Sequence, residues 1–273
     1  MPGSSPTPTF PQSRTSDGPG SRSTWLNKVP EVTATFWIIK VMSTTVGETG
    51  ADYLAARAEW GAELTGFLMT GLLLLALFLQ LRSSRCIPWR YWLTVVLVSI
   101  VGTQITDALT DGLDVSLYVS TAAFAVALAL LFALWYGQER TLSIRTIVTL
   151  RREAYYWGAV LCSFALGTAA GDLAAEEFGL GFRLAMAAFG ALIVVAATLR
   201  LAGANSVLVF WIAYVLTRPL GASLGDWLSQ APKYGGMGLG ATVTSALFLT
   251  VIIFLVTHAQ HAAHKSSLSG HET

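Results

Sequence analysis

Charged residues are scarce in this chain. Asp, Glu, Lys and Arg make up 12% of its 273 residues, whereas hydrophobic residues make up 53%. A soluble domain carries about 25% charged residues. The composition therefore argues against a soluble domain and predicts a protein in contact with the lipid bilayer. We expect no nucleic-acid partner.

The chain also has few cysteines, and we find neither the pattern of a signal peptide nor a metalloprotease motif. Cys86 and Cys162 are the only two cysteines and neither lies in a CxxC pattern, so we expect both to be reduced. The first 27 residues are rich in Ser, Pro, Gly and Thr and lack the apolar core of a signal peptide. They predict a disordered cytoplasmic tail over 1–28. Because no HExxH metalloprotease motif occurs, we expect no enzyme.

The chain does contain a four-fold repeat. An aromatic residue and a Trp are followed after nine residues by a Gly, and after four more by an Asp. The four copies are Phe36-Trp37, Gly47 and Asp52; Tyr91-Trp92, Gly102 and Asp107; Tyr156-Trp157, Gly167 and Asp172; and Phe210-Trp211, Gly221 and Asp226. Each copy lies in an apolar stretch long enough to cross a bilayer, where a carboxylate is costly. The four Asp therefore predict a shared polar site inside a membrane protein.

Apolar stretches of about 20 residues predict an all-α protein with eight transmembrane helices. They cover about 32–55, 62–82, 91–110, 115–136, 155–175, 181–201, 205–228 and 237–258. Each repeat thus holds two helices, and the second helix of each is almost free of charge. We expect four parallel two-helix repeats around a pseudo-symmetry axis, with the first helices nearest the axis and the second helices toward lipid.

The repeats lie at about 30–82, 88–137, 152–201 and 204–258, within a transmembrane domain over 29–260 that precedes a cytoplasmic tail over 261–273. Arg and Lys gather near both termini and in the loops after the second, fourth and sixth helices. The positive-inside rule therefore predicts that both termini are cytoplasmic.

The candidate ion-binding residues, and the candidate metal ligands, are Asp52, Asp107, Asp172 and Asp226. Glu48 lies one turn before the first of them, and hydroxyls such as that of Thr45 extend the polar stripe further inward. Carboxylate and hydroxyl oxygens suit protons or hard divalent cations, so a divalent ion is a possible ligand and no other cofactor is expected. The alternative is a solvated rim in which the carboxylates cap helix ends.

The Trp and Gly of the repeat each allow two interpretations. The four Trp residues (Trp37, Trp92, Trp157 and Trp211) would form an interfacial aromatic belt or an aromatic gate at the axis. The Gly residues would permit close helix packing or form hinges. The Asp follows the Gly by five positions, a rotation of about 140°, so we expect the Gly to face away from the polar cavity.

Two basic residues break the symmetry of the repeat. Lys40 lies one turn after Trp37 and would either snorkel to the interface or balance charge inside the bundle. Arg218 precedes Pro219, which removes a helix hydrogen bond, and an isolated guanidinium is costly in a bundle. We therefore predict that Arg218 pairs with a carboxylate of another repeat and that 217–221 is the moving part.

Three histidines follow the last predicted helix at three-residue spacing: His258, His261 and His264. They would bind a transition metal at the cytoplasmic mouth or belong to a solvated tail.

The segment VPEVTATFWIIKVMSTTVGETGAD, from Val29 to Asp52, carries a resemblance to a known group. It resembles uncharacterised bacterial membrane proteins built from four tandem copies of a repeat of unknown function, each with two transmembrane segments and a characteristic Trp. The resemblance covers residues 29 to about 260. It implies the repeat count and a bacterial inner membrane, and it implies no substrate.

The leading hypothesis is a secondary transporter of a small cation, such as Mn²⁺ or a proton, through a carboxylate-lined central cavity. Lys40 and Arg218 would balance the charge of the Asp residues. A cation channel is the alternative because four parallel repeats form an axial pore, although Arg218 on the axis would oppose free cation flow. A non-transporting scaffold or stress-response protein is the third hypothesis, and the oligomeric state stays open.

Overall fold

The computed structural model describes residues 27–57 and 61–269, which form helices and connecting loops with no strand in those ranges. The long helices are α2 (Ala34–Arg57), α3 (Gly61–Leu81), α4 (Pro88–Thr110), α5 (Leu117–Glu139), α6 (Leu150–Asp172), α7 (Gly181–Leu201), α8 (Ser206–Ser229) and α9 (Ala241–Ser269). Three short helices lie between them: η1 (Ile144–Thr146), the π-helical η2 (Leu173–Glu177) and η3 (Pro232–Tyr234).

Within the described ranges, seven of these helices, α3 to α9, are long and apolar enough to cross a membrane. They suggest a membrane protein, as the composition predicts. The eighth, α2, has 24 residues, about 36 Å of helix, but it is more polar. Its Lys40, Thr44 and Glu48 are nevertheless buried, because other helices surround it.

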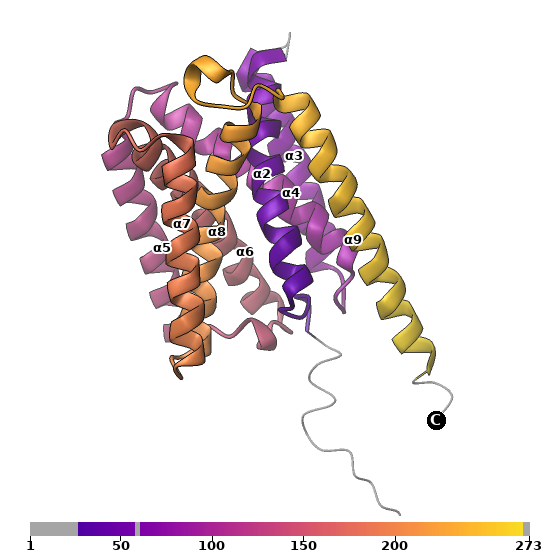
Figure 1. Cartoon of the computed structure of the whole chain (residues 1–273). Coiled ribbons are helices and arrows are strands. Elements are labelled where there is room, and N and C mark those ends of the chain that lie inside the picture. Colours follow the sequence, from indigo (N-terminus) through magenta and orange to yellow (C-terminus); the bar gives the residue numbers. More distant parts are fainter. Residues whose placement is uncertain (1–26, 58–60, 270–273) are drawn as a thin grey trace, which may run out of the picture.

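The first helices of the four repeats form a closed ring. α2 packs against α4, α4 against α6, α6 against α8, and α8 against α2. In Figure 1 these four helices occupy the middle of the bundle, with α5 and α7 on one side and α9 on the other. The expectation that the first helices lie nearest the axis is therefore confirmed.

Each second helix packs outside the ring, on the first helix of the following repeat. α3 lies on α4, α5 on α6, α7 on α8, and α9 closes the cycle on α2. Only 11% of the apolar segment of α5 is buried, against 56% of that of α8. The outer helices therefore present most of their apolar surface outward, as helices that contact lipid do.

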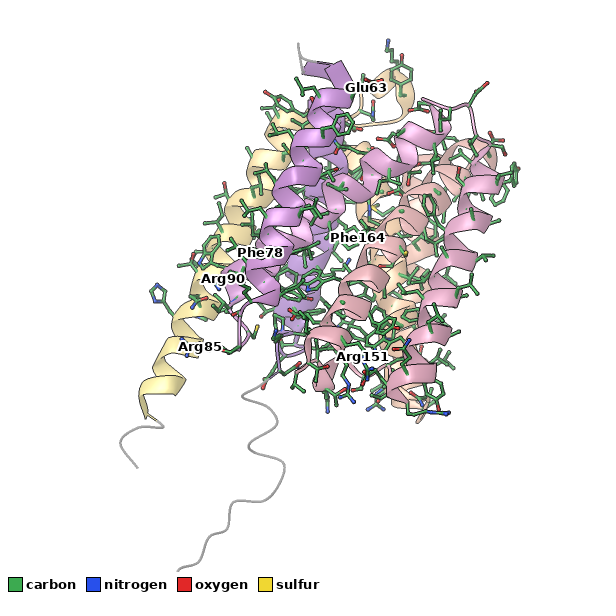
Figure 2. The ribbon with its side chains drawn as sticks, turned by 180° about the vertical axis from the view of Figure 1, so that it is seen from behind. Glu63, Phe78, Arg85, Arg90, Arg151 and Phe164 are labelled. Carbon is green, nitrogen blue, oxygen red and sulfur yellow. The ribbon has the colours of Figure 1, made fainter. Side chains whose placement is uncertain are left out.

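The two ends of the bundle carry different charges. The loops after α3, α5 and α7 lie at the end where α2 begins and α9 finishes (Figure 1). Figure 2 shows Arg85, Arg90 and Arg151 toward this end, and Glu63 at the opposite one. We call the first the Arg end and the second the Asp end.

Two boundaries differ from the sequence-based expectation. Most of the expected tail over 1–28 lies outside the described residues, but Lys28 is buried and its Nζ lies 2.6 Å from Glu153 Oε2 of α6. At the other terminus α9 continues past 258 to Ser269, because this stretch holds Ala, Gln and Lys and no Gly or Pro. His258 and His261 are exposed on this helix, and the side chain of His264 lies outside the described residues.

Candidate functional site

The site is built from one stripe of residues on each inner helix. Starting at the repeat aromatic and ending at the repeat Asp, the stripe takes every fourth residue, so each member lies about one turn from the last, on the same face as its neighbour in the stripe. The stripes are Phe36, Lys40, Thr44, Glu48 and Asp52; Tyr91, Val95, Ser99, Thr103 and Asp107; Tyr156, Val160, Phe164, Thr168 and Asp172; and Phe210, Tyr214, Arg218, Ala222 and Asp226. All these residues are buried except the four Asp and Phe210, which are half-buried. We call the four together the axial stripes.

The repeat glycines close the ring. A Cβ added at any of them would meet the next inner helix at the residue three positions before that helix's own repeat Gly. The pairs are Gly47 with Ser99, Gly102 with Phe164, Gly167 with Arg218, and Gly221 with Thr44. At Gly102, for example, the added Cβ would lie 2.8 Å from Phe164 Cβ, too close for two carbons. The predicted role in close helix packing is confirmed.

An aromatic layer occupies the axis toward the Arg end. The hydroxyls of Tyr91 and Tyr156 lie 2.5 Å apart. Each stripe aromatic also contacts the Trp of the following repeat. The centroid distances are 5.3 Å for Phe36–Trp92, 5.5 Å for Tyr91–Trp157, 6.1 Å for Tyr156–Trp211 and 5.6 Å for Phe210–Trp37. Trp92, Trp157 and Trp211 are buried and Trp37 is half-buried, so the repeat aromatics form a packed ring around the axis.

Lys40 lies on the axis next to this layer. Its side chain is fully buried, and its Nζ lies 4.0 Å from the ring centroid of Phe164 and 4.2 Å from that of Tyr214. Nζ has no hydrogen-bond partner among the described residues, so two aromatic faces provide its surroundings through cation–π contacts. The snorkelling interpretation is therefore wrong, because the ammonium points into the bundle.

Arg218 fills the middle of the axis. It is fully buried, and its Nη2 lies 2.5 Å from Glu48 Oε2, 2.8 Å from Thr168 Oγ1 and within hydrogen-bond distance of Thr103 Oγ1, so that three acceptors share its two N–H groups. These acceptors come from the three other inner helices, each at the position directly after the repeat Gly. The predicted pairing of Arg218 with a carboxylate of another repeat is confirmed. Sequence reasoning missed the two threonines as its partners, although their shared position with Glu48 marks them.

Thr45 and Pro219, two other predicted site residues, lie beside the axial stripes. Thr45 is buried, and its hydroxyl donates to Val41 O of its own helix at 3.2 Å. Pro219 lies inside α8, which runs on to Ser229, and it packs on the α6 glycines Gly167 and Gly171.

The four repeat Asp form the last layer, at the Asp end. All four are half-buried, and each interacts electrostatically with Glu48 and Arg218. Asp172 differs from the others because α6 ends there and continues as the π-helix η2, a distortion often found at functional sites. Within the described ranges, no group of three or more His, Cys, Asp or Glu side chains is placed to hold a metal ion, so a metal at the four Asp stays a prediction.

Residues 221–225 read Gly-Ala-Ser-Leu-Gly and match the GxSxG pattern of serine hydrolases. That motif exposes its Ser at a sharp turn from a strand to a helix. Here Ser223 lies inside α8 and is 2% exposed. Gly221 and Gly225 both pack on α2, so the two glycines of the pattern serve helix packing.

Comparison with known families agrees with this architecture. The family described as Repeat of Unknown Function (DUF347) matches residues 35–85, 90–141, 155–203 and 209–265. The chain belongs to the DUF347 family. Each DUF347 repeat contains one inner helix and the outer helix that follows it, so the predicted tandem repeat is confirmed. No curated protein and no solved structure matches this DUF347 protein.

Proposed function

We propose that this DUF347 protein is a secondary transporter of a small cation, in a bacterial inner membrane with the Arg end in the cytoplasm. The supporting observation is the charge of the axial stripes. They contain five acidic residues, Glu48 and the four repeat Asp, and two basic residues, Lys40 and Arg218. Five minus two leaves a formal excess of three negative charges when all are ionised. A protein interior with unmatched carboxylates attracts cations.

In this proposal the Asp layer is the entrance and Glu48 is the inner site. Glu48 lies one turn deeper than Asp52, about 6 Å along the helix. A cation or proton that reaches Glu48 competes with Arg218 for the carboxylate. Because the single negative charge of Glu48 can neutralise one positive charge at a time, binding of the cation or proton to Glu48 releases the guanidinium of Arg218 from the ion pair.

The release of Arg218 would be the moving step. Pro219 follows it and cannot donate a backbone hydrogen bond, so α8 has one fewer bond to break here than elsewhere. The aromatic layer closes the axis on the Arg side of Lys40. A cation at Glu48 would therefore leave toward the cytoplasm only after these rings part, which is the behaviour of a transporter with alternating access. The fixed positive charge of Arg218 on the axis disfavours an open cation channel.

Flux in liposomes tests this function. The purified full chain is reconstituted, and uptake of H⁺, Na⁺, K⁺, Mg²⁺ and Mn²⁺ is followed with ion-sensitive dyes. We expect saturable uptake of at least one cation, a loss of about tenfold or more in Glu48→Gln, and no loss in the control Glu63→Gln, since Glu63 is exposed on α3. Flux that never exceeds that of empty liposomes for any of the five ions would refute transport of these cations.

A further inference from the structure

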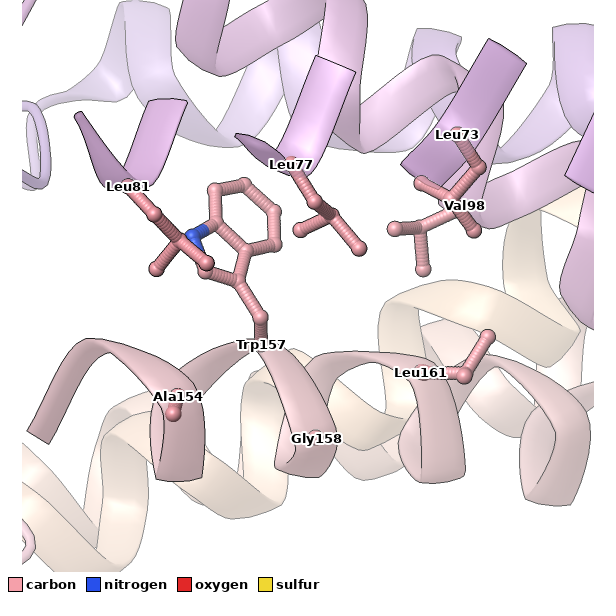
Figure 3. A pocket seen from close by; sticks show the side chains of 8 residues that line it. All are labelled: Leu73, Leu77, Leu81, Val98, Ala154, Trp157, Gly158 and Leu161. Carbon is pink, nitrogen blue, oxygen red and sulfur yellow. The ribbon is translucent and has the colours of Figure 1, made fainter. Parts of the chain in front are cut away.

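A cavity of about 260 Å³ lies between α3, α4 and α6, and none of its lining residues belongs to the axial stripes. Its walls are three leucines of α3 (Leu73, Leu77 and Leu81), Val98 of α4, and Trp157 and Leu161 of α6 (Figure 3). It opens at the surface beside Ala154, which is exposed. Small-molecule sites begin at roughly 300 Å³, so this cavity suits part of one apolar chain.

One polar group in this apolar wall is left over. Trp157 is 5% exposed, and its Nε1 has no hydrogen-bond partner among the described residues. The equivalent Trp211 of the fourth repeat donates from Nε1 to Leu142 O at 3.0 Å. Buried N–H groups are nearly always paired, and Figure 3 shows the Trp157 nitrogen on the Leu81 side of the cavity. An occupant with a hydrogen-bond acceptor at that depth would pair this N–H.

The same side of the cavity is bordered by positive charge. Arg82 follows Leu81 directly, with its Cζ 4.6 Å from the ring centroid of Phe78, Arg85 lies in the same loop, and both arginines are exposed. Arg151 precedes Ala154 by one turn of α6, and its side chain is 63% exposed although it also pairs with Glu139. Figure 2 shows Arg85 and Arg151 toward this end of the bundle. From the interior outward, the cavity thus offers an apolar slot, a hydrogen-bond donor and a basic rim.

We propose that this cavity binds an anionic phospholipid. One acyl chain enters the slot, its ester carbonyl accepts from Trp157 Nε1, and its phosphate and acidic headgroup lie among Arg82, Arg85 and Arg151. A phospholipid presents an apolar chain, an acceptor and a negative charge in this order along a single molecule. The site is independent of the proposed transport path, because it uses no residue of the axial stripes.

Native mass spectrometry of the delipidated full chain tests the proposal. The protein is titrated with phosphatidylglycerol and with phosphatidylcholine of the same acyl chains. We expect one phosphatidylglycerol to bind at least tenfold more tightly than phosphatidylcholine. Trp157→Phe keeps the ring and removes the N–H donor, and it should weaken this binding at least fivefold. The matched control is Trp37→Phe, at the same repeat position but outside the cavity, and it should bind like the wild type.

A second measurement covers the case in which Trp157→Phe folds poorly. Arg82→Gln with Arg85→Gln leaves the cavity intact, and it should reduce the preference for phosphatidylglycerol while binding of phosphatidylcholine stays constant. Equal affinity of the wild type for both lipids would overturn the proposal, as would undiminished binding in a folded Trp157→Phe protein. Neither outcome bears on the cation flux, so failure here is separable from failure of the proposed function.

Discussion

The ion pair between Arg218 and Glu48 offers the sharpest test of the axial arrangement, because the two residues are buried and come from different repeats. We consider three variants: Glu48→Gln, Arg218→Met and the double variant. Each single change leaves one charge in the bundle without its partner. The double change leaves a neutral axis of similar volume at this level.

The magnitude follows from the contacts. After Glu48→Gln, the guanidinium keeps two threonine hydroxyls but loses the only carboxylate that it contacts among the described residues. Breaking a buried ion pair from one side costs about 3–5 kcal/mol of unfolding free energy, whereas replacing both partners by neutral groups is often close to neutral. Arg218→Met should cost less than Glu48→Gln, because the stranded carboxylate can take up a proton. The sum of the two single effects should therefore exceed the double effect by about 3 kcal/mol or more.

The assay is reversible unfolding of the four proteins in mixed micelles at increasing SDS fraction, followed by circular dichroism. The free energies of unfolding of wild type, both single variants and the double variant give the coupling energy directly. Effects that add to within about 0.5 kcal/mol would show that the two residues do not interact. Additivity would refute the direct pair on the axis and remove the basis for exchange at Glu48.

Two further predictions concern the packing of the ring and a loop at the Arg end. Gly47→Ala should lower the unfolding free energy by about 1–3 kcal/mol, because the added Cβ would clash with Ser99. The control is Gly66→Ala, where the added Cβ meets nothing, and it should be neutral or stabilising by up to about 1 kcal/mol. Equal effects of the two substitutions would contradict the close approach of α2 and α4 at Gly47. Burial, together with the carboxylate of Glu153, raises the pKa of Cys86 from 9.0 to about 12, so at pH 8 its thiolate fraction falls about a thousandfold. Maleimide labelling of the native protein in a Cys162→Ser background should be correspondingly slow at pH 8 and become fast on unfolding in SDS; fast native labelling at pH 8 would contradict the raised pKa.

The ring of inner helices was predictable because the spacing of the repeat never changes. Equal spacing places equivalent residues at equal depth, and small residues such as Gly47 mark where two helices approach closely. Charge scarcity likewise identified α5 as an outer helix. These features depend only on residue spacing and composition, and both can be read from a single stretch of sequence without knowing which helices are neighbours.

The packing of the outer helices and the threonine partners of Arg218 were not predictable in the same way. An outer helix packs on the inner helix of the following repeat more than on that of its own repeat, and nothing in the local sequence distinguishes the two partners. The acceptors Thr103 and Thr168 belong to a stripe that becomes visible only when the four helices are aligned around one axis. Lys28 shows the same limit, since its partner Glu153 lies 125 residues away and the composition around Lys28 resembles a tail.

The axis also shows why four repeats in one chain differ physically from four identical subunits. In a ring of identical copies, the position of Arg218 would hold four guanidinium groups at one level, and their mutual repulsion in a dry interior would be large. Here the equivalent positions hold Thr44, Ser99 and Phe164, so one guanidinium faces acceptors from three neighbours. The position directly after the repeat Gly also differs between the repeats. Only the first repeat has a carboxylate there, Glu48, and this carboxylate pairs with the single guanidinium. Fusion of the repeats thus permits a single buried ion pair at the centre of a nearly symmetric ring, and that pair is the element whose opening we propose to be coupled to cation binding.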